Sequence, residues 1–299
     1  MKAIVTGGLG FIGSNIIKEL NKRGVFDIYI FDTKIETNSN LINAKFSEIL
    51  NDVNKLSSIN DVDVIFHQGA ITDTTFSNEI EMMKVNYDLS VTLYKLSQRN
   101  NSRFIYASSA AVYGLGANGF AENESCENPL NVYGLSKLKF DNFIRSSYSQ
   151  TQVVGLRYFN VFGLGEDHKM KMASPLNQFY HQAKRTNQIK VFEGSENFQR
   201  DFICIDDVIN VNMFFYDNPG KSGILNCGTS STTSFQEAAR ITSKTLNIPI
   251  TTIPFPEILK GKYQVYTCAD LTLLKKAGYQ KDFAKFEIAA TNYLQSLTS

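Results

Sequence analysis

Tyr133 and Lys137 are the two residues of this sequence whose types and spacing best suit acid–base chemistry. They stand four positions apart, so on a helix both side chains would leave the same face, one turn apart. An ammonium group stabilises a neighbouring phenolate, which lowers the pKa of the phenol from about 10 and makes it a usable general base. A Tyr and a Lys also meet at this spacing by chance on many amphipathic helices, so the pair acquires meaning only from the residues around it.

Ser108 and Ser109 are the next candidates, because they follow the apolar run Arg103–Ala107. Such a run predicts a buried strand, and ligands of open parallel sheets bind at the carboxyl ends of the strands. Two small residues commonly end a strand without any function. With Tyr133 downstream, however, Ser109 is the natural hydrogen-bond donor to a substrate oxygen.

A glycine-rich stretch near the start of the chain predicts a dinucleotide site. It contains Gly7, Gly10 and Gly13, and it lies between the apolar run Lys2–Thr6 and the helically spaced residues 14–23. In this strand, turn and helix order, the glycines permit the tight turn, the close approach of a pyrophosphate and the packing of helix on strand. The helix N-terminus also favours the anion. A turn without any ligand is the simpler alternative.

Asp32 bears on the identity of the dinucleotide. It ends a second predicted strand, Asp27–Phe31, nineteen positions after Gly13, which is near the separation at which an acid meets the adenosine ribose. A carboxylate there accepts hydrogen bonds from the ribose hydroxyls and repels a 2′-phosphate, which favours NAD. Lys34 and Lys45 lie close enough in sequence to offset that repulsion. The residues alone therefore leave NAD and NADP open.

Two further segments are expected to lie near the dinucleotide. Gln68, Gly69 and Ala70 follow the predicted strand Val62–His67 and are suited to lie against a cofactor. We interpret His67 as a strand-end histidine with a satisfied ring, not as a base. A long helix is predicted over 79–99, where Asn86 interrupts the apolar face and must find hydrogen-bond partners if it is buried.

Composition and charge exclude several classes of protein. The 299 residues carry 30 basic and 29 acidic side chains, a formal net charge of +1, which leaves no electrostatic footprint for nucleic acid or an anionic membrane. The four cysteines and three histidines are scattered, so we expect reduced thiols and no metal. Because Lys2–Thr6 already reads as a strand, we expect no secretory leader and a cytoplasmic protein.

The order of the predicted elements indicates an α/β fold, a Rossmann-type doubly wound parallel sheet with a smaller, mostly C-terminal substrate-binding domain. Further strands are expected at Val153–Tyr158 and at 223–228, and a helix at 174–185 lies in a polar stretch. The mixed residues 38–56 predict no defined element. We place the NAD(P)-binding domain at residues 1–166, with 203–247 returning to it, and the substrate-binding domain at 167–202 and 248–299.

Longer strings carry a family resemblance. Together with Tyr133 and Lys137, the strings Thr6–Ser14 and Tyr106–Gly114 resemble the extended short-chain dehydrogenase/reductase family. Within it, the chain is similar nearly end to end to the ADP-heptose 6-epimerases, through the strings Asn128–Gly134, Arg157–Gly163, Phe192–Phe202 and Lys260–Gln264. The resemblance implies an isomerase that inverts C6 of an ADP-linked heptose for lipopolysaccharide core synthesis, through a transient ketone and enzyme-bound NADP. It also implies a homo-oligomer, a pentamer.

The resemblance assigns roles by position. Tyr133 matches the catalytic tyrosine, Lys137 its partner on the nicotinamide ribose, and Ser109 the hydroxyl at the reacting oxygen. Lys169 matches a proposed second base. The cofactor contacts are assigned to Gly7, Gly10, Phe11, Ile12, Gly13, Asp32, Thr33, Gln68, Gly69, Ala70, Asn86, Tyr133, Lys137, Val161 and Lys169. The substrate contacts are assigned to Ser109, Asn160, Lys171, Phe192, Glu193, Gly194, Ser195, Arg200 and Tyr263.

Arg200 suits bidentate recognition of a diphosphate oxygen. Residues Thr33–Asn40 depart from the family pattern, which weakens its preference for NADP in this chain.

Other functions remain to be distinguished. A nucleotide-sugar 4-epimerase such as UDP-glucose 4-epimerase uses the same hydride chemistry with a tyrosine alone. A 4,6-dehydratase requires an acid pair just after the strand serines, where this chain has Ala110 and Ala111. A non-catalytic NAD(P)-binding sensor would need neither Ser109 nor Tyr133 intact.

Overall fold

The computed structural model describes residues 1–33, 39–257 and 264–298, and its contacts divide the chain into two compact units. Unit 1 comprises Met1–Val112, Pro129–Arg157 and Ile209–Leu225, and unit 2 comprises Tyr113–Asn128, Tyr158–Val208 and Asn226–Ser299. Residues 113–128, 158–166 and 203–208, expected in the first domain, group with unit 2. Residues 226–247, also expected in the first domain, do the same. The physical reason is helix α8 (Phe235–Leu246), which buries Ala238, Ala239 and Ile241 in the core of unit 2.

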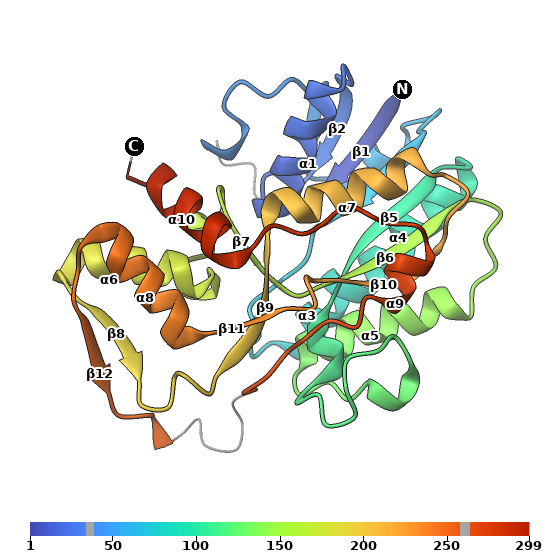
Figure 1. Ribbon diagram of the computed structural model, residues 1–299. Helices are drawn as coiled ribbons and strands as arrows, with labels where there is room; N and C mark the ends of the chain where they lie inside the picture. The colour runs from blue at the N-terminus through green and yellow to red at the C-terminus, as the bar shows by residue number, and fades with distance from the viewer. Residues whose placement is uncertain (34–38, 258–263, 299) are drawn as a thin grey trace. The chain divides into compact units, whose positions relative to one another are not determined.

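A parallel sheet organises unit 1, as the sequence predicted. Within the described residues seven strands form it, in the order β10-β6-β5-β4-β1-β2-β3 (Figure 1). They are β1 (Lys2–Thr6), β2 (Asp27–Phe31), β3 (Glu48–Leu50), β4 (Val64–His67), β5 (Arg103–Ser109), β6 (Val153–Tyr158) and β10 (Gly223–Cys227). The strands run parallel in the pairs β1–β2, β2–β3, β1–β4 and β4–β5. The chain therefore proceeds to opposite sides of β1, and the resulting switch point is where ligands of such sheets bind.

Helices flank this sheet because their apolar faces pack on its buried strands. They are α1 (Phe11–Lys22), α2 (Val53–Ser57), α3 (Glu79–Met83), α4 (Leu89–Arg99), α5 (Val132–Arg145) and α7 (Ile205–Asp217). Leu93 and Leu96 of α4 and Phe140 of α5 join Ile65 and Phe104 of the strands in one buried cluster. Between α3 and α4 the helix widens into a π-turn, Lys84–Asp88, instead of the continuous helix predicted over 79–99. Such turns occur frequently at functional sites.

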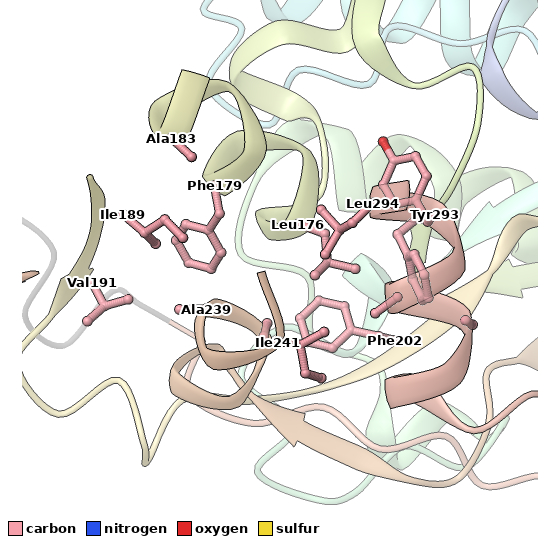
Figure 2. Packing of buried hydrophobic residues seen from close by; sticks show 14 residues of the cluster. Leu176, Phe179, Ala183, Ile189, Val191, Phe202, Ala239, Ile241, Tyr293 and Leu294 are labelled. Carbon is pink, nitrogen blue, oxygen red and sulfur yellow. The ribbon is translucent and has the colours of Figure 1, made fainter. Parts of the chain in front are cut away.

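Unit 2 has a core of its own. Its helices are α6 (Pro175–Thr186), α8, α9 (Thr272–Lys276) and α10 (Phe286–Ser296), and its strands are β7 (Asn160–Phe162), β8 (Ile189–Phe192), β9 (Gln199–Cys204), β11 (Thr232–Ser234) and β12 (Ile250–Ile253). β9 pairs with β11 antiparallel and with β7 parallel, and β8 pairs with β12 parallel. Figure 2 shows Leu176 of α6, Ile241 of α8, Leu294 of α10 and Phe202 of β9 converging in one apolar cluster.

No helix in residues 1–33, 39–257 and 264–298 has the length and apolarity that a membrane crossing requires. In the same part of the chain, no group of three or more His, Cys, Asp and Glu side chains is arranged to hold a metal ion.

Candidate active site

The glycine turn of unit 1 is packed so closely that its glycines leave no room for side chains. Gly7 has φ +63°, and a Cβ on it would lie 2.7 Å from Gly69 Cα. A Cβ on Gly13 would lie 2.3 Å from the carbonyl oxygen of Gly7. Gly10 caps α1 without a side-chain hydrogen bond, so the positive end of the helix is offered by backbone alone. This bare backbone cradle fits a dinucleotide pyrophosphate.

Other predicted cofactor residues meet at the same end of the sheet. Asp32 follows β2, and its carboxylate accepts a hydrogen bond from Leu9 N at 3.2 Å, which places the acid beside the glycine turn. Gln68 follows β4 on the other side of β1, where its N–H donates to Thr6 O at 3.1 Å. Phe11 and Ile12 begin α1, Thr33 follows Asp32, and Gly69 and Ala70 follow Gln68.

Ser109 and Tyr133 are brought together by β5 and α5. Ser109 ends β5 and accepts a hydrogen bond from Ala111 N at 3.1 Å, while Tyr133 lies in the first turn of α5. Asn131 caps that helix by accepting from Gly134 N at 2.9 Å, which fixes where Tyr133 begins the helix. The hydroxyl of Ser109 lies close enough to Tyr133 to lower the pKa of the phenol. The pair predicted from two distant segments is thus formed within one unit.

The charge states of the site differ from the simple expectation. Burial raises the pKa of Tyr133, and the hydroxyl of Ser109 opposes that rise only in part. The sequence predicted a lowered phenol pKa, which the chain by itself does not produce because burial disfavours the phenolate. Lys137 is 4% exposed and donates from Nζ to Ala107 O at 2.9 Å. Burial lowers its pKa to about 8, with the nearby Asp141 opposing.

Asp141 was not singled out by the sequence, although it continues the face of α5 that carries Tyr133 and Lys137. It is fully buried and accepts hydrogen bonds from Tyr106 Oη, Ser108 Oγ and Arg157 Nε, each at 2.9 Å. Burial raises the pKa of the Asp141 carboxyl, and Arg157 and the two hydroxyls oppose the rise. These hydrogen bonds join α5 to β5, through Tyr106 and Ser108, and to β6, through Arg157. The spacing of four positions after Lys137 was the available signal.

Asn86 is buried in the π-turn, and its amide is fully satisfied, as the sequence required. Its Oδ1 accepts from Ile71 N at 2.8 Å, and its Nδ2 donates to Ile71 O at 2.9 Å and to Ser136 Oγ at 3.1 Å. Asn86 therefore anchors the segment that follows Ala70 to the helix that carries Tyr133.

Lys169 lies in unit 2, in a short 3₁₀ segment over Asp167–Met172. Its backbone N–H donates to Glu166 O at 2.9 Å. Burial lowers the pKa of the Lys169 ammonium, and Glu166 opposes this effect. The Glu166 carboxylate, which the sequence did not single out, is itself buried and accepts from Ser174 N at 2.6 Å and from Gly163 N at 3.2 Å.

Several predicted substrate residues of unit 2 have internal partners. Asn160 Nδ2 donates to Asp201 O and to Thr267 Oγ1, both at 3.1 Å, and Ser195 Oγ donates to the side chain of Gln236 at 2.8 Å. Arg200 is 6% exposed, donates to the carbonyl oxygens of Gln199 and Gln264, and stacks over Phe235 at 5.5 Å.

The remaining predicted residues of unit 2 lie in or beside its strands and turns. Val161 is in β7, Phe192 ends β8, Glu193 follows it, and Gly194 has φ +78° in the turn beyond. Lys171 lies two positions after Lys169 and is exposed. Tyr263 lies outside the described residues.

Comparisons with known proteins agree with this geometry. The model of the NAD dependent epimerase/dehydratase family matches residues 3–228. The chain is 46% identical to ADP-L-glycero-D-manno-heptose-6-epimerase of Brachyspira hyodysenteriae, over 98% of this chain and 97% of that protein. It is 39% identical to the enzyme of the same name from Thiobacillus denitrificans, over 98% of each chain. The crystal structure of the Helicobacter pylori enzyme of that name superposes with a TM-score of 0.88 at 31% identity, over 100% of this chain and 96% of the other.

Proposed function

The chain belongs to the NAD dependent epimerase/dehydratase family, and on that premise we propose that it inverts C6 of the heptose in ADP-D-glycero-D-manno-heptose. The product would be ADP-L-glycero-D-manno-heptose, a precursor of the lipopolysaccharide core. Support comes from the relatives of that name, which match at 46% and 39% identity over nearly the whole chain. The reaction has no net redox change, because the oxidised carbon is reduced again on the enzyme.

The cofactor in this proposal is NADP, with NAD as the alternative. The glycine turn would hold the pyrophosphate, Asp32 the adenosine ribose and Lys137 the nicotinamide ribose. A nicotinamide bound there would supply a hydride acceptor for C6 and a donor for its reduction from the opposite face. The family description supports a nicotinamide cofactor in general. The dinucleotide released from denatured protein, analysed by chromatography, distinguishes NADP from NAD.

The residues of the chain divide the proton chemistry. Ser109 Oγ holds the reacting oxygen by a hydrogen bond. Tyr133 Oη, which must first ionise to the phenolate against the cost of its burial, takes the proton of the C6 hydroxyl. Inversion needs an acid/base group on each face of the carbon, so Lys169 Nζ serves the second face. Because burial lowers the pKa of Lys169, its neutral amine is more accessible than that of a solvated lysine. Arg200 binds the diphosphate.

The observation that carries the proposal is that Ser109 at the end of β5 influences the pKa of Tyr133 in the first turn of α5, with Lys137 one turn along the same helix. A 4-epimerase could use the same pair, so the substrate is what the experiment must decide.

The deciding experiment incubates purified protein with ADP-D-glycero-D-manno-heptose in heavy water and examines C6 of the product by NMR. We expect inversion without deuterium at C6, because the hydride returns directly. A Tyr133→Phe variant should lose at least about a hundredfold in kcat, the usual range for a general acid–base group. Solvent deuterium at C6, or a Tyr133→Phe variant as fast as the parent, would contradict the mechanism.

Control substrates separate the rival functions. Turnover of UDP-galactose without action on ADP-heptose would identify a 4-epimerase. Binding of NADP without conversion of any sugar nucleotide would identify a sensor. We also propose a cytoplasmic homo-oligomer, a pentamer by family resemblance, whose mass light scattering measures.

A further inference from the structure

A continuous chain of buried hydrogen bonds links the glycine turn of unit 1 to the π-turn. Gly69 N–H donates to Thr6 Oγ1 at 3.1 Å, and Thr6 Oγ1 lies 2.6 Å from His67 Nδ1. His67 Nε2 lies 2.7 Å from Ser90 Oγ, which donates to the carbonyl oxygen of Asn86 at 2.6 Å. The side chains that make these hydrogen bonds are each at most 2% exposed: Thr6, His67, Ser90 and Asn86. Water therefore does not compete for these contacts.

Only one arrangement of protons satisfies every hydrogen bond from Gly69 to Asn86. The hydroxyl hydrogen of Ser90 is used on the Asn86 carbonyl, so Ser90 must accept from His67, and Nε2 carries the imidazole proton. The Nδ1 atom of His67 is then bare and accepts the hydroxyl hydrogen of Thr6. All donors consequently point the same way, from Gly69 to Asn86.

The chain continues from Asn86 to the catalytic helix. Asn86 Nδ2 donates to Ser136 Oγ at 3.1 Å, and Ser136 Oγ donates to the carbonyl oxygen of Tyr133 at 2.7 Å. Buried polar groups thus connect the backbone beside the glycine turn to the backbone of Tyr133. From Gly69 to Asn86, each of these groups can donate in one direction only.

We propose that Thr6, His67, Ser90 and Asn86 are positioning residues that hold the Tyr133 end of α5 in register with the glycine turn. The inference rests on the proposed function, because the position of Tyr133 matters to a reaction at the dinucleotide. Buried polar groups can often be replaced by apolar ones without loss of stability, whereas a fully satisfied network specifies one geometry. That geometry is what a phenol acting on a bound substrate needs.

His67 acts here as a neutral hydrogen-bond spacer and not as a base. Burial lowers the pKa of His67 to about 3, and the ammonium of Lys137 adds to that effect. The rings of Phe104 and Phe140 lie 5.9 and 6.5 Å from the imidazole, centroid to centroid, and exclude water from it. An imidazolium would present a second donor to Thr6 and break the chain.

The first test reads the tautomer of His67 directly and needs no substrate. Long-range ¹H–¹⁵N spectra of the labelled full-length protein, assigned through contacts of His67 with Phe104 and Phe140, should show a protonated Nε2 and a bare Nδ1 between pH 5 and 8. A protonated Nδ1, or formation of an imidazolium in this range, would overturn the proposal.

The second test compares two serines of the same helix. Ser90 and Ser97 both lie in α4, are buried, and donate to a backbone carbonyl within one turn. Ser97, however, donates to Tyr94 O, which is not part of the hydrogen-bond chain. Ser90→Ala should lower kcat on the order of tenfold, the usual size of a coupling within one network. Ser97→Ala, which deletes the same atom, should leave kcat within about twofold at a similar loss of thermal stability.

A third variant tests whether the hydroxyl of Ser90 is what matters, and each contrary outcome points to a different failure. Ser90→Thr restores the hydroxyl and should recover most of kcat. Equal slowing by Ser97→Ala, or parent kcat in Ser90→Ala, would overturn the positioning role. A parent protein that leaves ADP-heptose unchanged would overturn the proposed function, while the His67 tautomer would still decide whether the ordered chain exists.

Discussion

Lys137 brings a titratable ammonium into the interior of unit 1. Its Nζ donates to the carbonyl oxygen of Ala107, and burial lowers its pKa to about 8 from 10.5. Asp141 lies four positions further along the same helix and favours the charged form. The residue therefore changes charge near the upper end of the physiological range, where a dinucleotide or substrate oxygen could shift it further.

This lowered pKa predicts a specific dependence of stability on pH. Between pH 8 and 10.5 the unfolded chain binds the proton of Lys137 and the folded chain releases it, so stability rises with pH in this window. Relative to a Lys137→Met variant, the free energy of unfolding of the parent should rise by about 3 kcal/mol across it. Urea titrations of both proteins at several pH values measure the difference, in which other titrating groups cancel. A difference that stays constant would contradict the lowered pKa.

At the residue scale, the sequence predicted what short spacing determines. Tyr133 and Lys137 share a helix face, and their pairing with Ser109 could be expected because β5 and α5 follow each other in the fold. The Asp141–Arg157 contact could not, because it joins a helix to the following strand and depends on packing. His67 was correctly predicted to have a satisfied ring, but its partners Thr6 and Ser90 lie 61 and 23 positions away.

Gly13 tests the glycine turn at the scale of an element. In an ordinary helix alanine is more stable than glycine by up to about 1 kcal/mol. In α1 its Cβ would lie 2.3 Å from Gly7 O, so the backbone of the turn must shift. Gly13→Ala should lower the free energy of unfolding by about 1–3 kcal/mol. Dinucleotide affinity, measured by fluorescence titration, should fall with it.

A matched control exists elsewhere in unit 1. A Cβ on Gly220 would have no atom within 4 Å, so Gly220→Ala should change stability by no more than about 0.5 kcal/mol. Parent-like affinity in Gly13→Ala would show that the close packing of this turn is not needed for binding.

Elements with strong local signals were predicted correctly, and those with weak signals were not. The strand, glycine turn and helix at the start of the chain follow from apolar runs and from residues that permit one backbone path. The π-turn Lys84–Asp88 could not be predicted, because one additional residue in a helical turn barely disturbs the apolar spacing. In and just beyond the stretch 38–56, β3 and α2 have three and five residues, which is too short for a periodic pattern.

At the scale of the whole molecule, dinucleotide binding should stabilise the fold. A ligand that binds only the folded state adds about 2.7 kcal/mol to the free energy of unfolding at a hundred times its Kd. We expect NADP to raise the melting temperature accordingly in calorimetry and to do so much less for Gly13→Ala. An unchanged melting temperature for the parent at saturating NADP and NAD would contradict a dinucleotide site.

The division into units was the part of the architecture least accessible to sequence. The sequence predicted that residues 203–247 return to the first domain, but contacts assign only Ile209–Leu225 to unit 1. The helix pattern of Phe235–Leu246 identifies an apolar face without stating which core receives it. That choice is made by the packing of α8 against α6 and α10.

The interrupted course of unit 1 also constrains how the protein can be made. Its last segment ends at Leu225, so most of the 299 residues must leave the ribosome before strand β10 can join β6. Until then the nascent sheet presents an open apolar edge of the kind that invites aggregation. Synthesis of this protein therefore passes through an interval, from the end of β6 to the emergence of β10, in which this edge of the sheet is unpaired.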